Sequence, residues 1–393
     1  MSSLHGVDTG LYIHVPFCTT RCGYCDFNTY TPGEEGTSSV GTYLSALEAE
    51  LDRAASDWDR PGPPSTVFLG GGTPSLLGAD GLTRVLNAVR RSLGLAPGAE
   101  VTTESNPEST SPEFFEALLD AGYTRISLGM QSASAHVLKV LERRHTPGRA
   151  TAAATEAMDA GFAHVNLDLI YGTPTETDDD LRRSLDAALA TGVDHISAYS
   201  LIVEDGTAMA RKVRKGQLPE PDEDVYADRY EMIDAALRSA GMRWYEVSNW
   251  SRPGGECRHN LVYWRGGQWW GAGPGAHGCV RLREGVDGYH DGLTRLVNAK
   301  LPRRYAEALS SGNSPVTDTE QLSAADVHTE RILTGLRLAE GLPDALLADA
   351  PNAVDRHVGL GLLEQVAGRT RLTDAGRLLA DGIITDILLE EDV

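Results

Sequence analysis

The repeated alternation of short apolar segments with helical segments restricts the fold of this chain more than any other feature. Six apolar segments occur in the first half of the chain, and segments with helical periodicity separate them. The apolar segments are Leu11–Val15, Thr66–Gly70, Glu100–Ser105, Arg125–Met130, His164–Ile170 and His195–Leu201. Strands that alternate with helices form right-handed βαβ units and a parallel sheet. The sequence therefore predicts an α/β fold with six βα units.

Composition excludes several classes of function. The chain has 393 residues and is 41% apolar, which is enough for a large core and a smaller second domain. It carries 35 basic and 56 acidic residues, a net charge of −21, which argues against nucleic acid as a partner. No apolar run approaches the ~18 residues that a membrane span needs. Residues 1–10 have neither a basic nor an apolar signal region, so we expect a cytoplasmic protein without a signal peptide.

Polar and glycine residues follow several of the predicted strands. Gly70-Gly71-Gly72-Thr73-Pro74 follows the second strand, and no Gly-Lys-Ser/Thr follows it as in a phosphate-binding loop. Glu104, Gln131 and Asp168 lie near the ends of the third, fourth and fifth strands, and Arg143 follows Gln131. Each alone could be a cap or a loop anchor. Active residues in parallel α/β barrels lie at the carboxyl ends of the strands. Together, these polar and glycine residues therefore predict a site at that edge of the sheet.

Three cysteines, Cys18, Cys22 and Cys25, follow the first strand with the spacing C-x₃-C-x₂-C. Three thiolates can hold three irons of a four-iron, four-sulfur cluster and leave the fourth iron open. A disulfide framework would need an oxidising compartment, and structural zinc usually takes four ligands in two pairs. The remaining cysteines, Cys257 and Cys279, form no such pair, and we expect both to be semi-buried thiols. Zinc and chance spacing remain the alternatives.

The cysteine triplet resembles the signature of the radical S-adenosylmethionine (SAM) superfamily. In that superfamily the open iron binds the amino and carboxylate groups of SAM, and an electron from the cluster cleaves the cofactor. The protein binds, orients and shields both groups. The resemblance implies an open (βα)₆ partial TIM barrel, and Tyr24 fits an aromatic position beside the cluster and the adenine.

The whole set of residues resembles one branch, the oxygen-independent coproporphyrinogen III oxidases and the HemW haem chaperones. In that branch the first SAM lies at positions that match Tyr12, Gly71 and Glu104. A second SAM, or a neighbouring site, is implied at the positions Tyr24, Gly72, Thr73, Gln131, Arg143 and Asp168. The number of SAM molecules stays open.

Features that separate the two relatives favour the chaperones. The oxidases carry a fourth cysteine where this chain has Phe27, and a long extension where only a short segment precedes Leu11. Residues 259–264, HNLVYW, match the HNxxYW motif of the HemW group. We therefore predict a haem chaperone that binds a [4Fe-4S] cluster, SAM and haem and transfers haem to acceptor haemoproteins. The alternative is a coproporphyrinogen III oxidase, an activity that we do not expect.

The HNxxYW segment lies in a region dense in tryptophan, glycine and histidine. Broad aromatic surfaces can stack on a porphyrin, and an imidazole can ligate haem iron, so His259 is a candidate ligand. The other interpretation is an aromatic cluster that closes the barrel, with His259 hydrogen-bonded internally. Cys257 is a minor alternative ligand, and we expect His277 to be a loop residue. Neither His14 nor His145 is expected to be a catalyst.

Three parts are predicted: a radical SAM core (1–240), an aromatic and glycine-rich extension (241–314) and a C-terminal domain like that of the oxidases (315–393). A helix, a hairpin around Ala367-Gly368 and a final helix predict a small winged-helix-like α+β domain. It has no basic helix for DNA. The resemblance also implies respiratory haem proteins as acceptors, and with them attachment to the membrane surface without insertion.

Overall fold

The computed structural model describes residues 9–144 and 146–391 and is built around one twelve-stranded mixed sheet. The strand order is β12-β11-β10-β9-β1-β2-β3-β4-β5-β6-β8-β7, and the run from β9 to β6 is parallel. The six predicted strands are β1 (Thr9–Val15), β2 (Thr66–Gly71), β3 (Glu100–Ser105), β4 (Arg125–Gln131), β5 (His164–Tyr171) and β6 (His195–Ser200). The predicted open α/β barrel is thereby confirmed.

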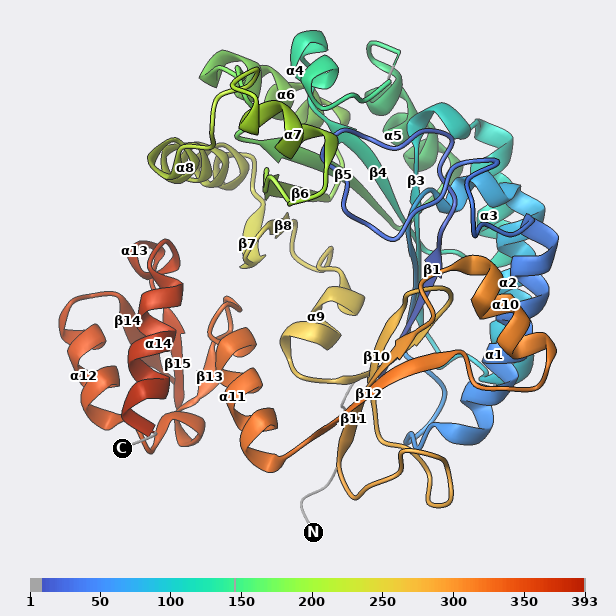
Figure 1. Cartoon of the computed structure of the whole chain (residues 1–393). Coiled ribbons are helices and arrows are strands. Elements are labelled where there is room, and N and C mark those ends of the chain that lie inside the picture. The colour runs from blue at the N-terminus through green and yellow to red at the C-terminus, as the bar shows by residue number, and fades with distance from the viewer. Residues whose placement is uncertain (1–8, 145, 392–393) are drawn as a thin grey trace.

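Helices cover the outer face of the curved sheet (Figure 1). Those between the parallel strands are α1 (Val40–Asp57), α2 (Gly78–Ser92), α3 (Pro112–Ala121), α4 (Ala135–Val140), α5 (Arg149–Ala160) and α6 (Asp178–Thr191). Short 3₁₀ helices, η1 (Pro74–Leu77) and η2 (Pro107–Ser109), follow β2 and β3, and α7 (Ala208–Arg214) and α8 (Glu223–Ser239) follow β6. Local signals set the ends: Thr177 forms a capping box with Asp180 at α6, and Gly122 ends α3 with a φ of 103°.

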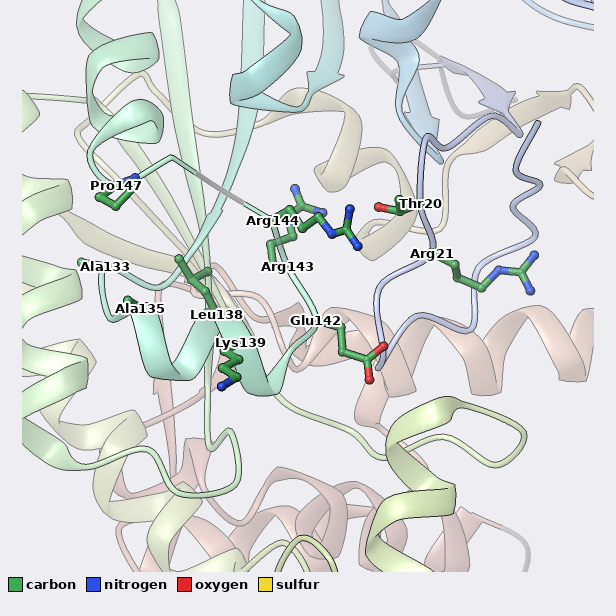
Figure 2. Close-up of a pocket in the computed structure, with 10 residues that line it drawn as sticks. All are labelled: Thr20, Arg21, Ala133, Ala135, Leu138, Lys139, Glu142, Arg143, Arg144 and Pro147. Atoms are coloured by element: carbon green, nitrogen blue, oxygen red, sulfur yellow. The ribbon is translucent and has the colours of Figure 1, made fainter.

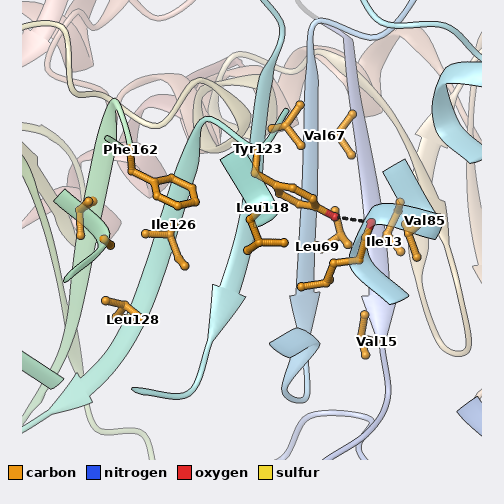
Figure 3. Packing of buried hydrophobic residues seen from close by; sticks show 14 of the residues in the cluster. Ile13, Val15, Val67, Leu69, Val85, Leu118, Tyr123, Ile126, Leu128 and Phe162 are labelled. Carbon is orange, nitrogen blue, oxygen red and sulfur yellow. Dashed lines mark hydrogen bonds between the residues drawn. The ribbon is translucent and has the colours of Figure 1, made fainter. Parts of the chain in front are cut away.

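The main apolar core lies between the sheet and these helices (Figure 3). Alternate side chains of the strands, such as Ile13 and Leu69, point outward and are fully buried against Val85 of α2 and Leu118 of α3. Tyr123, also buried, donates its hydroxyl hydrogen bond to the carbonyl of Leu82 at 2.9 Å. The side chains at the alternate positions of these strands therefore point into the interior of the half-barrel.

The predicted extension continues the sheet on both sides of the six strands. It contributes β7 (Arg243–Glu246), β8 (Asn249–Ser251), α9 (Arg258–Trp264), β9 (Gln268–Ala272), β10 (His277–Val280), β11 (Leu293–Asn298) and α10 (Pro302–Ser310). Strand β12 (Val316–Leu322) pairs with β11, so the sheet runs past the predicted boundary at residue 315. The reason is the antiparallel register of β12, which continues the β10–β11 meander.

The C-terminal domain begins at α11 (Ala324–Gly335) and has its own apolar cluster. It continues with β13 (Leu342–Pro343), η3 (Asp344–Leu347), α12 (Pro351–Gly359), β14 (Leu363–Val366), β15 (Arg369–Leu372), α13 (Asp374–Arg377) and α14 (Ala380–Glu391). The hairpin turns at Ala367 and Gly368, whose φ angles are 53° and 78°, as predicted. The domain is α+β, and its likeness to a winged helix stays a prediction.

The C-terminal domain lies at the open side of the sheet, beside α9 in Figure 1. Arg377 forms a largely buried ion pair with Asp234 of α8 at 2.8 Å and lies over the ring of Trp244. Ala339 donates a backbone hydrogen bond to the carbonyl of Tyr245 at 2.9 Å. None of the helices in residues 9–144 and 146–391 is both long and apolar enough to cross a membrane.

Candidate active site

A cavity of about 510 Å³ opens where β1–β6 end, and we call it the cluster cavity. Eleven of the predicted site residues line it: Cys18, Cys22, Tyr24, Cys25, Gly71, Gly72, Thr73, Glu104, Gln131, Arg143 and Asp168. They come from different strands, and they meet because the carboxyl ends of parallel strands share one edge of the sheet. Tyr12 and His259 are not part of its lining.

The cysteine loop is fastened at both ends. Cys18 donates its backbone hydrogen bond to Tyr30 at 3.1 Å, and Gly23 donates to the carbonyl of Leu141 at 3.1 Å. The backbone carbonyl of Asn28 accepts a hydrogen bond from His14 Nε2 at 2.9 Å, so the His14 ring packs against the cysteine loop, as expected. The thiols are thus presented by a loop whose backbone is held from β1 and from the end of α4.

The three thiols are half-buried and face the same cavity. Cys18 accepts a hydrogen bond from Thr73 Oγ1 at 3.7 Å, and Cys22 accepts one from Arg143 Nη1 at 3.5 Å. Burial raises the pKa of the Cys18 and Cys25 thiols, and bound iron would remove these protons. Within the described residues no three His, Cys, Asp or Glu side chains are placed to hold a single metal ion. A cluster needs a different arrangement, because each thiolate binds its own iron. The donor set fits a cluster.

The glycines after β2 allow that loop to lie directly against the cysteine loop. Gly72 donates to the carbonyl of Val15 at 2.8 Å, and a Cβ on Gly72 would lie 2.5 Å from the carbonyl oxygen of Phe17. Gly71 has a φ of 108°, and a Cβ there would lie 2.5 Å from the ring of His14. Only glycine fits at these positions, so backbone rather than side chain faces the cavity.

Two carboxyl groups inside the cavity have shifted pKa values. Burial, together with the charge of Asp168, raises the pKa of Glu104 to about 8, although the N–H of Gly71 donates to it at 3.1 Å. Burial also raises the pKa of Asp168, against hydrogen bonds from Ser127 at 2.9 Å and Asn166 at 2.7 Å. Carboxyl groups that lack water favour a ligand with hydroxyl donors or positive charge. The ribose and sulfonium of SAM have both properties.

Gln131 and Arg143 are positioned by a feature that the sequence did not indicate. The register between β4 and β5 shifts after Gly129, and Gln131 adopts a φ of 64°. A Cβ on Gly129 would lie 2.7 Å from Arg143 Nη2 and 2.8 Å from Gln131 Nε2. Gly129 therefore leaves the space that both side chains occupy. Its only sequence signal was a glycine in the middle of a buried strand.

The structure places His259 away from the cluster cavity. It is 1% exposed, its Nδ1 lies 2.8 Å from Thr66 Oγ1, and its Nε2 lies 2.8 Å from the hydroxyl of Tyr263. Burial lowers its pKa to about 3. Both ring nitrogens are used within the protein, so the contacts favour the internally bonded interpretation over iron ligation. Tyr12 lies between the two regions, stacked on Phe68, whose other neighbour is His259.

Helix α9 and the segment before it close the end of the half-barrel where the strands begin. His259 N–H donates to Glu100, the first residue of β3, at 3.0 Å. Glu100 also pairs with Arg125, the first residue of β4, at 3.0 Å. The thiol of Cys257 is buried and donates to Glu100 at 3.6 Å. Cys257 and Cys279 are free thiols, as expected, but both are buried rather than semi-buried.

Two other histidines need placement. His277 is the exposed first residue of β10 rather than a loop residue, because the strand pairs with β11 from that position. His145 lies outside the described residues.

Known proteins resemble this chain over nearly its whole length. Residues 12–188 match the radical SAM superfamily, and the fold and the thiol-lined cavity are those of a radical SAM protein. The chain is 56% identical over 389 residues to the heme chaperone HemW of Mycobacterium tuberculosis (strain H37Rv), covering 99% of this chain and 97% of the relative. The HemW proteins of Bacillus subtilis (strain 168) and Escherichia coli (strain K12) are 31% and 32% identical, covering 96% and 97% of this chain and 99% and 98% of theirs. The chain belongs to the HemW family.

The fold also has a solved counterpart. Coproporphyrinogen III oxidase (HemN) from Escherichia coli superposes with a TM-score of 0.79 at 21% identity, over 97% of this chain and 90% of the oxidase. This similarity supports the fold and does not by itself distinguish chaperone from oxidase.

Proposed function

We propose that this protein is a haem chaperone that binds a [4Fe-4S] cluster, SAM and haem and passes haem to acceptor haemoproteins. The observation that carries the proposal is the cluster cavity, where three thiols from one loop meet the glycine loop and two carboxyl groups. The sequence identity with HemW proteins over nearly the whole chain favours the chaperone over the oxidase. Phe27 at the position of the oxidases' fourth cysteine agrees with it.

Different residues of the cluster cavity would hold the cluster and SAM. Cys18, Cys22 and Cys25 would bind three irons, and Arg143 would offset the negative charge that gathers at Cys22. The backbone of the Gly71–Thr73 loop would contact the methionine end of SAM, and Glu104 would accept hydrogen bonds from it. When bound, the cluster and SAM supply one-electron chemistry.

The cellular part of the proposal follows from the same family. We expect a cytoplasmic protein that meets its acceptors, among them respiratory haem proteins, at the membrane surface. Haem would be held while it passes between proteins, because free haem is sparingly soluble and reactive.

Anaerobic reconstitution with iron and sulfide tests the proposal. We expect a brown protein with about four irons per chain, a shift of its absorption or electron paramagnetic resonance on adding SAM, and saturable haem binding. Changing Cys18, Cys22 and Cys25 to alanine should abolish the cluster. The matched control Cys279→Ala, which removes a buried thiol of β10, should keep it.

The rival function is tested with the same material. Reconstituted protein is incubated with SAM, a reductant and coproporphyrinogen III. We expect no decarboxylated product and transfer of bound haem to an apo-haemoprotein. Formation of protoporphyrinogen, or a protein that binds no haem, would overturn the chaperone proposal.

A further inference from the structure

A second pocket of about 480 Å³ adjoins the cluster cavity, and we call it the basic pocket. Its wall is formed by α4, the segment after α4 and the cysteine loop (Figure 2). Thr20, Arg143 and Arg144 line both cavities, so the two share a wall. In Figure 2 the side chains of Arg143 and Arg144 extend toward the loop that carries Thr20.

The charge of the basic pocket is opposite to that of the whole protein. It contains Arg21, Lys139, Arg143 and Arg144 against one acid, Glu142, in a chain with a net charge of −21. Glu142 is already paired with a lysine of α7, and Arg21 with a glutamate of its own loop. The exposed side chains of Lys139 and Arg144 make no ion pair or hydrogen bond with any described residue. The pocket therefore offers unpaired positive charge to an anion.

Part of the mouth of the cluster cavity next to it is apolar, although the exposed acidic residues Asp26 and Glu204 also line the cavity. Phe27 is 62% exposed, Ile202 is 64% exposed and Tyr199 is 43% exposed, and all three line the cavity. Large apolar side chains gathered at a cavity mouth mark a contact for an apolar ligand or partner. A ligand that suits both features has a flat apolar body and carboxylates at one edge.

We propose that haem lies across this shared mouth, with its two propionates in the basic pocket near Arg144 and Lys139. Its macrocycle then rests against Phe27, Tyr199 and Ile202 at the mouth of the cluster cavity. The inference rests on the proposed haem binding and names the surface that performs it. It places haem at the opposite end of the strands from His259, whose ring nitrogens are both engaged.

Titration of the reconstituted full-length protein with haem and with haem dimethyl ester tests the charge recognition. The ester keeps the macrocycle and lacks the two negative charges. We expect the wild type to bind the ester about tenfold more weakly than haem, and Arg144→Ala to weaken haem about threefold to fivefold. Arg144→Glu should weaken haem about tenfold and leave ester binding unchanged. Discrimination between the two ligands should then disappear.

Controls keep the result interpretable. Arg304→Glu changes an exposed arginine of α10 outside both cavities and should bind haem and ester as the wild type does. Haem affinity is referred to the fraction of each variant that carries a cluster, measured as iron content, because Arg144 and Ile202 also line the cluster cavity. A second variant, Ile202→Ser, should weaken both ligands equally, since it removes apolar contact and adds no charge.

Two outcomes overturn the inference. Arg144→Glu that binds haem with wild-type affinity, or a wild type that binds haem and its ester alike, would place the propionates elsewhere. A wild type that binds neither ligand would instead refute the proposed haem chaperone function, and so the two failures are distinguishable.

Discussion

The contact between the glycine loop and the cysteine loop predicts a large effect of adding one methyl group at Gly72. In Gly72→Ala the new Cβ would lie 2.5 Å from the carbonyl oxygen of Phe17 and 2.9 Å from that of Val15. Ordinary van der Waals contact begins at 3.4 Å, and both neighbours are backbone atoms that cannot rotate away. The loops must therefore separate.

The magnitude follows from the contacts that separation removes. Crowding of this kind costs about 1–3 kcal/mol. Separation also weakens two backbone hydrogen bonds, Gly72 to Val15 at 2.8 Å and Thr73 to Phe17 at 2.7 Å, each worth about 1 kcal/mol. We expect the cluster-free protein to lose about 2–4 kcal/mol of unfolding free energy and the reconstituted protein to retain less iron.

Urea unfolding followed by circular dichroism measures the stability, and colorimetric iron analysis measures the cluster. Gly382→Ala is the matched control, because a Cβ there meets nothing within 4 Å and the position lies in α14. It should be as stable as the wild type or slightly more so. Gly72→Ala with wild-type urea midpoint and full iron content would refute the steric argument.

The other predictions concern pH, the aromatic segment and the domain contact. The pKa of Glu104 is raised from 4.5 to about 8, so its protonated form stabilises the fold, and that stability is lost as pH rises from 4.5 through about 8. In Glu104→Gln, the urea midpoint of the cluster-free protein should no longer show this part of the pH dependence. A pH profile identical to that of the wild type would contradict this prediction. His259→Ala should cost about 2–4 kcal/mol in the same assay yet leave haem affinity intact in folded protein; a lost Soret shift would contradict this. Arg377→Ala removes the buried arginine partner of Asp234, which keeps Trp250 and Arg238, and should cost about 1–3 kcal/mol. Limited proteolysis should then release the C-terminal domain, whereas wild-type resistance would show that the pair does not hold it.

The parts of the fold that sequence predicted well are those with local signals. The βα alternation and the helix caps can be read within a few residues, and the convergence of Cys18, Gly71, Glu104 and Asp168 follows from parallel strands ending at one edge. No side-chain contact had to be known for that result.

The parts of the fold that the sequence did not predict depend on strand pairing between segments that are far apart in the sequence. Strand β9 adds to β1 in parallel, Thr9 beside Gln268, although the two segments lie at opposite ends of the core. Strand β12 joins the same sheet through β11, so the sheet extends past residue 315. Register between segments so far apart is set by tertiary packing rather than by local pattern.

His259 illustrates the limit of motif reasoning. Histidine next to aromatic residues suits haem ligation in the sequence, but the imidazole is satisfied by Thr66 and Tyr263 inside the fold. Conversely, Gly129 shapes the cavity although it carries no reactive group. Burial and partners, which decide both cases, are three-dimensional properties.

The attachment of the cysteine loop to the far end of the core has a consequence for how the protein is made. Asn28 donates to the carbonyls of Pro274 and Lys300, and β1 needs β9 to cover its edge. On a ribosome that adds about 5–20 residues per second, the thiols emerge on the order of tens of seconds before these partners do. We therefore expect stable iron–sulfur loading to follow the synthesis of Pro274 and Lys300 rather than that of the cysteines.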